Sequence, residues 1–138
     1  MKKKNWIFRL MLLTSLFIAS CNNTPEPKKE EKRSDLVVIK NGIYTEFYPG
    51  KKAIKFRGPQ NTSGQRNGRW YFYAPNGDEQ SSTEYTDGKK NGFIFVRYPN
   101  GAMRYTGEYT NDTPSGLWRF YKEDGTIDQE KNYATEIE

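Results

Sequence analysis

The 138-residue sequence contains no histidine and only one cysteine. The absence of histidine excludes Ser-His-Asp and Cys-His catalytic sets and histidine-bound metals within this chain. A single cysteine excludes an intramolecular disulfide and a cysteine-cluster metal site. Walker loops, GxSxG elbows and EF-hand loops are absent as well, and the carboxylates lie mostly in turns, where they are typically solvated. We therefore expect the protein to bind no metal and to be no enzyme.

The sequence also lacks an apolar run long enough to cross a membrane. Its longest such stretch, residues 10–18, is far shorter than the roughly 20 residues that a spanning helix needs. Lysines at positions 2–4 precede this stretch, and the small residues Ala19 and Ser20 follow it. A basic start, a short apolar segment and small residues before a cleavage point are typical of an export signal.

The end of this segment, Ile18-Ala19-Ser20-Cys21, resembles the lipobox of bacterial lipoproteins. The resemblance implies that residues 1–20 are a signal peptide and that Cys21 carries a diacylglycerol and an N-acyl chain; no other cofactor is expected. It also implies a cell-envelope protein held at the membrane by its lipid anchor. Asn22 is not the aspartate that retains enterobacterial lipoproteins in the inner membrane, which favours the outer membrane in a host with two membranes. The alternatives are an ordinary secretory signal or a buried cysteine in a hydrophobic helix.

The net charge of +5 belongs mostly to the signal peptide. Four of the 22 basic side chains and none of the 17 acidic ones lie in residues 1–20, which leaves 18 basic against 17 acidic groups. A nearly neutral chain without a basic stripe argues against nucleic-acid binding. Residues 22–34 have no aromatic or aliphatic side chain, so we expect residues 21–34 to form a lipidated, flexible tether.

The remainder, residues 35–138, repeats with a period of 24 residues. Three units are clear and an earlier one begins at Asn41-Gly42, so we expect about four. Each unit has an aromatic-rich strand, a turn with Asn-Gly or Asp-Gly, a more polar strand and a second turn. The glycines that we assign to these turns are Gly68, Gly77, Gly92, Gly101, Gly116 and Gly125.

This pattern predicts an all-β fold, an elongated and twisted antiparallel meander of hairpins. Alternation along each first strand places one set of apolar side chains on a common face, which we expect to be the core. That set is Trp70, Phe72, Ile94, Val96, Trp118 and Phe120. We also expect an opening strand at residues 35–40 and an inserted loop at residues 57–65, between the first and second units.

The opposite face of the same strands carries a second aromatic set with two arginines. Its members are Tyr71, Tyr73, Phe93, Phe95, Arg97, Arg119 and Tyr121. If this face is open, it is a candidate binding surface on which Arg97 and Arg119 could hold a partner's carboxylates. Two alternatives remain at this point: a twisted sheet can bury both faces of its middle strands, and arginines at a sheet rim are commonly just solvated.

The stretch from Tyr105 to Tyr109, followed by Gly116, Trp118 and Asp124-Gly125, resembles a MORN repeat. The 24-residue spacing resembles more closely the bacterial branch known as YwqK-type antitoxins. The resemblance extends over roughly residues 41–133 and implies a sheet with a concave, aromatic-rich side that serves as an interaction platform. We therefore expect a membrane-anchored, MORN-like module that binds a protein. The alternatives are a glycan- or cell-wall-binding lipoprotein and an immunity or antitoxin-like inhibitor.

Overall fold

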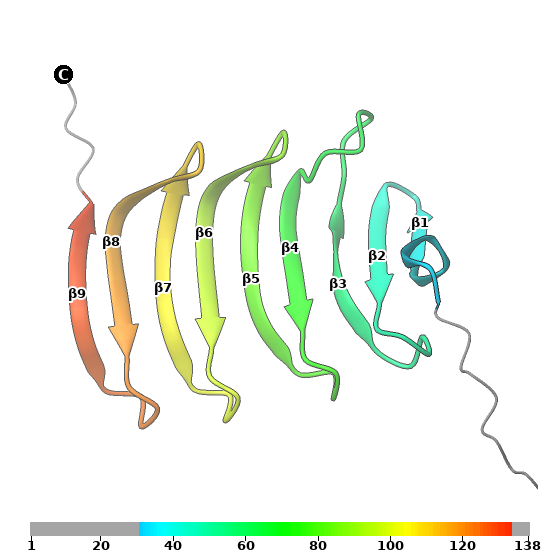
Figure 1. Cartoon of the computed structure of the whole chain (residues 1–138). Helices are drawn as coiled ribbons and strands as arrows, with labels where there is room; N and C mark the ends of the chain where they lie inside the picture. The colour runs from blue at the N-terminus through cyan, green and yellow to red at the C-terminus, as the bar shows by residue number, and fades with distance from the viewer. Residues whose placement is uncertain (1–30, 134–138) are drawn as a thin grey trace, which may run out of the picture.

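A computed structural model describes residues 31–133, which form one antiparallel sheet of nine strands in sequence order (Figure 1). The strands are β1 (Val37–Lys40), β2 (Ile43–Phe47), β3 (Ile54–Pro59), β4 (Gly68–Tyr73), β5 (Glu79–Thr86), β6 (Lys89–Arg97), β7 (Met103–Thr110), β8 (Thr113–Tyr121) and β9 (Ile127–Tyr133). A 3-10 turn, η1 (Arg33–Leu36), precedes β1. The predicted all-β meander of hairpins is confirmed. The signal peptide and Cys21 lie outside the described residues.

Each repeat unit contributes two neighbouring strands to the sheet. The three later units correspond to β4–β5, β6–β7 and β8–β9, and the first unit to β2–β3. The turns inside the later units are alike: in each, the amide of a glycine donates to a carbonyl three residues earlier, and these glycines are Gly77, Gly101 and Gly125. Within each of these turns only the glycine has positive φ. This is the pattern of a three-residue hairpin loop in which a type I turn is followed by a bulge. The turn assignment is confirmed for these three glycines.

The assignment of Gly68, Gly92 and Gly116 to turns was wrong. Gly68 begins β4, while Gly92 and Gly116 lie inside β6 and β8, where the register is irregular. The second and third units, and the third and fourth, are joined by two-residue turns, Asp87-Gly88 and Asn111-Asp112, all four residues with positive φ. Asparagine and aspartate adopt this backbone region more readily than other non-glycine residues, which allows two-residue hairpin turns.

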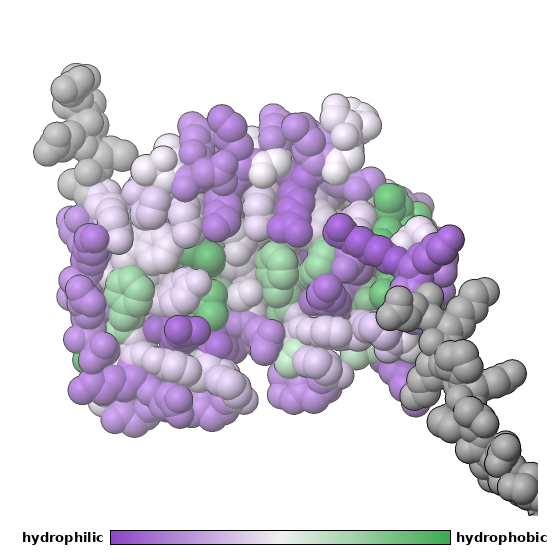
Figure 2. All heavy atoms as spheres, viewed as in Figure 1, coloured by the Kyte–Doolittle hydropathy of each residue, from purple (hydrophilic) through white to green (hydrophobic). Residues whose placement is uncertain are grey.

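One face of the sheet, which we call the tryptophan face, carries the predicted core. Trp70, Ile94 and Trp118 are buried, with 3%, 6% and 6% of their surface exposed. Phe72, Val96 and Phe120 lie beside them and are half-buried. Figure 2 shows apolar side chains in a band across the middle of the sheet, with hydrophilic ones toward both ends of the strands. The core is therefore one layer of side chains that cover one another.

The N-terminal end of the described chain differs from expectation at two points. The first strand begins at Val37, because Arg33–Leu36 form the 3-10 turn, whose Leu36 is buried. Part of the expected tether therefore lies against the sheet, and the Gly50 amide also donates to a carboxylate oxygen of Glu31 at 2.8 Å. The expected loop at residues 57–65 was placed too early, since Arg57 to Pro59 belong to β3.

Candidate binding face and a buried carboxylate

The face opposite the tryptophans, which we call the tyrosine face, carries the predicted binding residues. Register places Tyr71 opposite Ser82, Ser82 opposite Phe95, and Phe95 opposite Thr106, which faces Arg119. The side chains of Tyr71, Tyr73, Phe95, Arg97 and Tyr121 are half-buried. Phe93 has 39% of its surface exposed, and Arg119 is exposed. No second layer among residues 31–133 covers this face, so its aromatic rings remain reachable from solvent.

The arginines of the tyrosine face differ in what they contact. Arg119 forms an ion pair with Glu130, Nε to Oε1 at 2.8 Å, and Arg69 forms one with Glu84, Nη2 to Oε1 at 2.6 Å. Arg97 donates to the carbonyl oxygen of Gly101 and stacks over the Phe95 ring at 5.1 Å. The charge of Arg119 is therefore already neutralised by Glu130. Arg97 and Arg119 are not two free cations, as the idea that both hold a partner's carboxylates requires.

Arg57 is a cation of this face that sequence reasoning missed. It lies in β3, opposite Thr45 on one side and Tyr71 on the other. Its side chain is exposed, and within the described part of the chain it forms no ion pair. The sequence analysis assigned it to an inserted loop, because the glycine and the proline that follow it suggested a turn. Because side chains alternate along a strand, placing Phe56 on the tryptophan face would have placed Arg57 on the tyrosine face.

A cavity of about 170 Å³ opens beside Arg57 on the tyrosine face. Two arginines and two tyrosines contribute to its walls, with an isoleucine and a proline: Arg57, Arg69, Tyr71, Tyr73, Ile43 and Pro59. Burial raises the pKa of the Tyr73 phenol, so this hydroxyl keeps its proton at neutral pH. Within residues 31–133, the Tyr73 phenol forms no hydrogen bond and is available to a ligand, whereas the Tyr71 phenol interacts with Arg69.

Ser82 lies at the centre of the tyrosine face and has 0% of its surface exposed. It is flanked in register by Tyr71 and Phe95. Within residues 31–133, its hydroxyl oxygen has no hydrogen-bond partner. A small residue at this point lets the rings of the two neighbouring strands lie close to the sheet.

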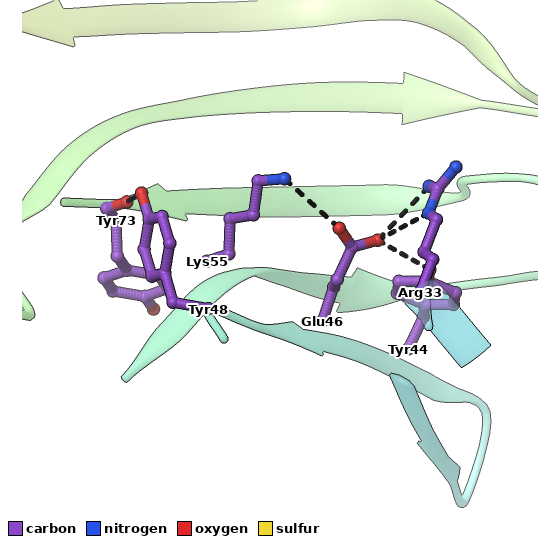
Figure 3. Close-up of polar contacts among 6 residues, drawn as sticks. All are labelled: Arg33, Tyr44, Glu46, Tyr48, Lys55 and Tyr73. Atoms are coloured by element: carbon purple, nitrogen blue, oxygen red, sulfur yellow. Dashed lines mark hydrogen bonds and ion pairs between the residues drawn. The ribbon is translucent and has the colours of Figure 1, made fainter. Parts of the chain in front are cut away.

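A second polar centre lies at the N-terminal end of the tryptophan face, around Glu46 (Figure 3). Only 4% of Glu46 is exposed. Its carboxylate accepts hydrogen bonds from Tyr44 at 3.0 Å, Lys55 at 3.3 Å and Arg33 at 3.2 Å. Burial raises the pKa of the Glu46 carboxyl, but the hydrogen bonds from Tyr44, Lys55 and Arg33 outweigh burial and hold this pKa below its ordinary value.

The repeat makes Glu46 exceptional. Tyr44 and Glu46 occupy the positions of Trp70 and Phe72 in the second unit and of Trp118 and Phe120 in the fourth. A buried carboxylate therefore replaces a core aromatic residue. Comparing the first unit with the others at these two positions could have identified it from sequence.

The Glu46 centre joins the start of the described chain to the first hairpin. Its two oxygens are occupied by donors, and Arg33 comes from η1, so the carboxylate fixes that turn on the first hairpin. A cavity of about 480 Å³ adjoins it, with Leu36, Pro49 and Phe56 among its walls. Within residues 31–133, no second carboxylate is hydrogen-bonded to Glu46.

Glu84 in β5 is another carboxylate with structural partners. Arg69 and the backbone amide of Phe93 donate to Glu84, and these two contacts hold the pKa of its carboxyl below the usual value. Among residues 31–133, no three carboxylate or cysteine groups come together as metal ligands. In the same part of the chain, no helix has the length and apolarity to cross a bilayer. No protein-family model matches the chain, and neither does any curated protein.

Proposed function

We propose that the protein is a lipid-anchored repeat module that binds a protein partner through its tyrosine face. The observation that carries the proposal is the uncovered set of Tyr71, Phe93 and Tyr121 on a rigid sheet. Tyrosine and arginine are enriched among residues that dominate binding energy at protein interfaces, because each combines apolar area with hydrogen-bonding capacity. The proposal includes MORN-like repeats and no enzymatic activity.

The sheet supplies the rigidity that such a surface needs. Tyr48 and Tyr98 donate from their hydroxyls to the carbonyl oxygens of Tyr73 and Tyr121 at 2.7 and 2.9 Å. Each bond crosses from one unit to the next at the end of a strand that presents the tyrosine face. Side chains held on strands lose little freedom on binding, which favours affinity.

The proposed anchor at Cys21 places this surface at the cell envelope, with the outer membrane favoured in a host that has two membranes. The nearly neutral mature chain supports a protein partner over nucleic acid, since counterion release contributes little without a basic surface. Lipidation would confine the module to two dimensions and raise the local concentration of a membrane-associated partner.

Crosslinking and co-purification from native membranes tests the proposal. Wild type is compared with Cys21→Ser, with Tyr71→Ala/Tyr121→Ala and with Gln129→Ala/Lys131→Ala, a matched pair on exposed positions of β9. A protein recovered with wild type and with the β9 pair, but lost with the tyrosine pair, supports binding by the tyrosine face. Retention by the tyrosine pair rejects that face.

Loss of the partner only in Cys21→Ser would mean that the anchor brings the two proteins together while a different surface binds. If no protein is enriched with wild type, protein binding is rejected. Sugar stacking on the same exposed rings then becomes the function to test, with glycan arrays and cell-wall fragments at millimolar concentrations.

A further inference from the structure

We propose that the cavity between Arg57, Arg69, Tyr71 and Tyr73 is an anion subsite that receives a carboxylate from an acidic segment of the partner. The inference rests on the proposed function and narrows it, because it names the chemistry that the tyrosine face recognises. It assigns the end of the face formed by β3 and β4 as the place where that recognition occurs.

The donors around the cavity are the first support. Guanidinium groups bind carboxylates with two parallel N–H donors, and phenol hydroxyls add single hydrogen bonds. Arg69 already uses Nε and Nη2 on Glu84, so it contributes only its remaining donors. Arg57 forms no ion pair within residues 31–133 and can offer its whole guanidinium.

The distribution of charge is the second support. Arg69 and Arg119 each have a carboxylate of their own, and Arg97 is held by a carbonyl oxygen and a ring. Of the two arginines that line the cavity, Arg57 is the one without a carboxylate partner within residues 31–133. Neither Glu84 nor Glu79, the acidic residues on the adjoining strand β5, lines the cavity.

The apolar walls are the third support. Ile43 and Pro59 border the same cavity, so the methylene stem of a glutamate has contacts beside the cationic end. Because the mature chain carries 18 basic and 17 acidic groups, an acidic peptide gains little from the overall charge of the molecule. Binding must come from a local site.

A fluorescent decaglutamate peptide is the probe, with decaglutamine as the uncharged control. Fluorescence anisotropy at low ionic strength measures its affinity for the full mature chain carrying Cys21→Ser. Arg57→Gln is expected to weaken binding about tenfold through the loss of a charge-assisted contact. The matched control is Arg104→Gln, an exposed arginine of β7 that does not line the cavity and lies 5.8 Å from the ring of Tyr98.

Three results would overturn the inference. The first is that decaglutamate does not bind at all. The second is that it binds equally well to wild type and to Arg57→Gln. The third is that Arg104→Gln weakens peptide binding as much as Arg57→Gln does. Displacement of the peptide by inorganic phosphate at concentrations where acetate has no effect would reassign the site from carboxylate to phosphate. Because Arg57 is exposed, both variants are expected to melt as wild type does by circular dichroism.

The membrane co-purification separates this inference from the proposed function. A partner that is lost with Tyr71→Ala/Tyr121→Ala but fully retained with Arg57→Gln upholds binding by the tyrosine face and rejects the anion subsite. A partner that is lost with both variants supports the two together. A partner retained with the tyrosine pair rejects the proposed function, whatever the peptide measurement shows.

Discussion

The indole ring of Trp118 lies directly on Gly107. A Cβ atom at Gly107 would overlap the ring, and Gly58 stands in the same relation to Trp70. In both places the indole Nε1 donates to the carbonyl oxygen of the residue after the glycine, at 3.1 Å for Trp118 and 2.7 Å for Trp70. Ile94 of the third unit stands in place of the tryptophan, and its register partner Thr83 in the preceding strand β5 stands in place of the glycine. The presence of tryptophan in a unit thus depends on glycine in the preceding strand.

The dependence predicts a coupling between positions 107 and 118. Gly107→Thr alone should cost about 1–3 kcal/mol of the free energy of unfolding, because the new side chain overlaps the ring. Adding Trp118→Ile recreates the Thr83–Ile94 pair, so the double variant should be more stable than the sum of the two single changes by about 1 kcal/mol or more. Urea denaturation of the four proteins measures this interaction energy.

A pair of sites without contact provides the control for that cycle. Gly125 lies in a turn where a Cβ atom meets no atom within 4 Å. Gly125→Thr is strained by its positive φ, but combined with Trp118→Ile it should add within about 0.5 kcal/mol. Equal coupling in both cycles would show that the effect does not arise from ring contact with Gly107.

Trp118→Ala tests the core itself. The ring is 6% exposed and contacts the aromatic side chains of Tyr105, Tyr109 and Tyr133 at centroid distances of 5.9, 5.2 and 6.0 Å. Its removal should cost about 3–5 kcal/mol, since the neighbouring strands cannot close over a cavity of that size. A thermal or urea melt gives the value, and a loss under about 1 kcal/mol would contradict the core placement.

Periodicity predicted the sheet and its core, because turns and alternating strands are local features. The roles of the glycines were not predictable in the same way. Of the twelve glycines, ten have positive φ, and only Gly58 and Gly107 do not. Those two positions need glycine because a tryptophan ring of the next strand, eleven or twelve residues further along the chain, occupies the space of a side chain. A local sequence pattern cannot distinguish a glycine required for positive φ from a glycine required for this space.

The candidate site was only partly predictable for a related reason. Strand alternation placed Tyr71 and Phe95 correctly on the face opposite the tryptophans. Which arginine is free depends on the cross-strand partner, and Glu130 lies opposite Arg119 only because of the register between β8 and β9. Sequence analysis missed Arg57 because Gly58 and Pro59 resemble a turn. In the structure, Gly58 leaves space for the Trp70 ring, and the Pro59 carbonyl oxygen accepts a hydrogen bond from the Trp70 indole N–H.

Glu46 predicts a pH dependence of stability. Its folded-state pKa lies below the ordinary value, so the carboxylate contributes stability above the unfolded pKa of about 4.3 and loses it as pH falls through the folded value. Glu46→Gln should cost about 1–3 kcal/mol at pH 7, and the difference from wild type should shrink as pH falls from about 5 to 3. Urea denaturation at a series of pH values measures both curves.

Glu130→Gln is the control for this titration. Both partners of the Arg119–Glu130 pair have about half of their side-chain surface exposed, so the change should cost no more than about 1 kcal/mol at pH 7. A difference between wild type and Glu46→Gln that stays constant from pH 7 to pH 3 would contradict the stabilising role of the ionised carboxylate.

Ser82 and Ser115 form a matched pair of buried serines for a last test. In the part of the chain that the structure describes, the Ser82 hydroxyl has no hydrogen-bond partner, whereas the Ser115 hydroxyl accepts a hydrogen bond from Thr110 at 3.0 Å. Ser82→Ala removes an unsatisfied polar group and should leave stability unchanged or raise it by up to about 1 kcal/mol, while Ser115→Ala should lower it by about 0.5–1.5 kcal/mol. Urea denaturation of the two variants gives the comparison. Equal losses at both sites would mean that a bound water satisfies Ser82 beneath Tyr71 and Phe95, and that polar groups can reach the centre of the tyrosine face.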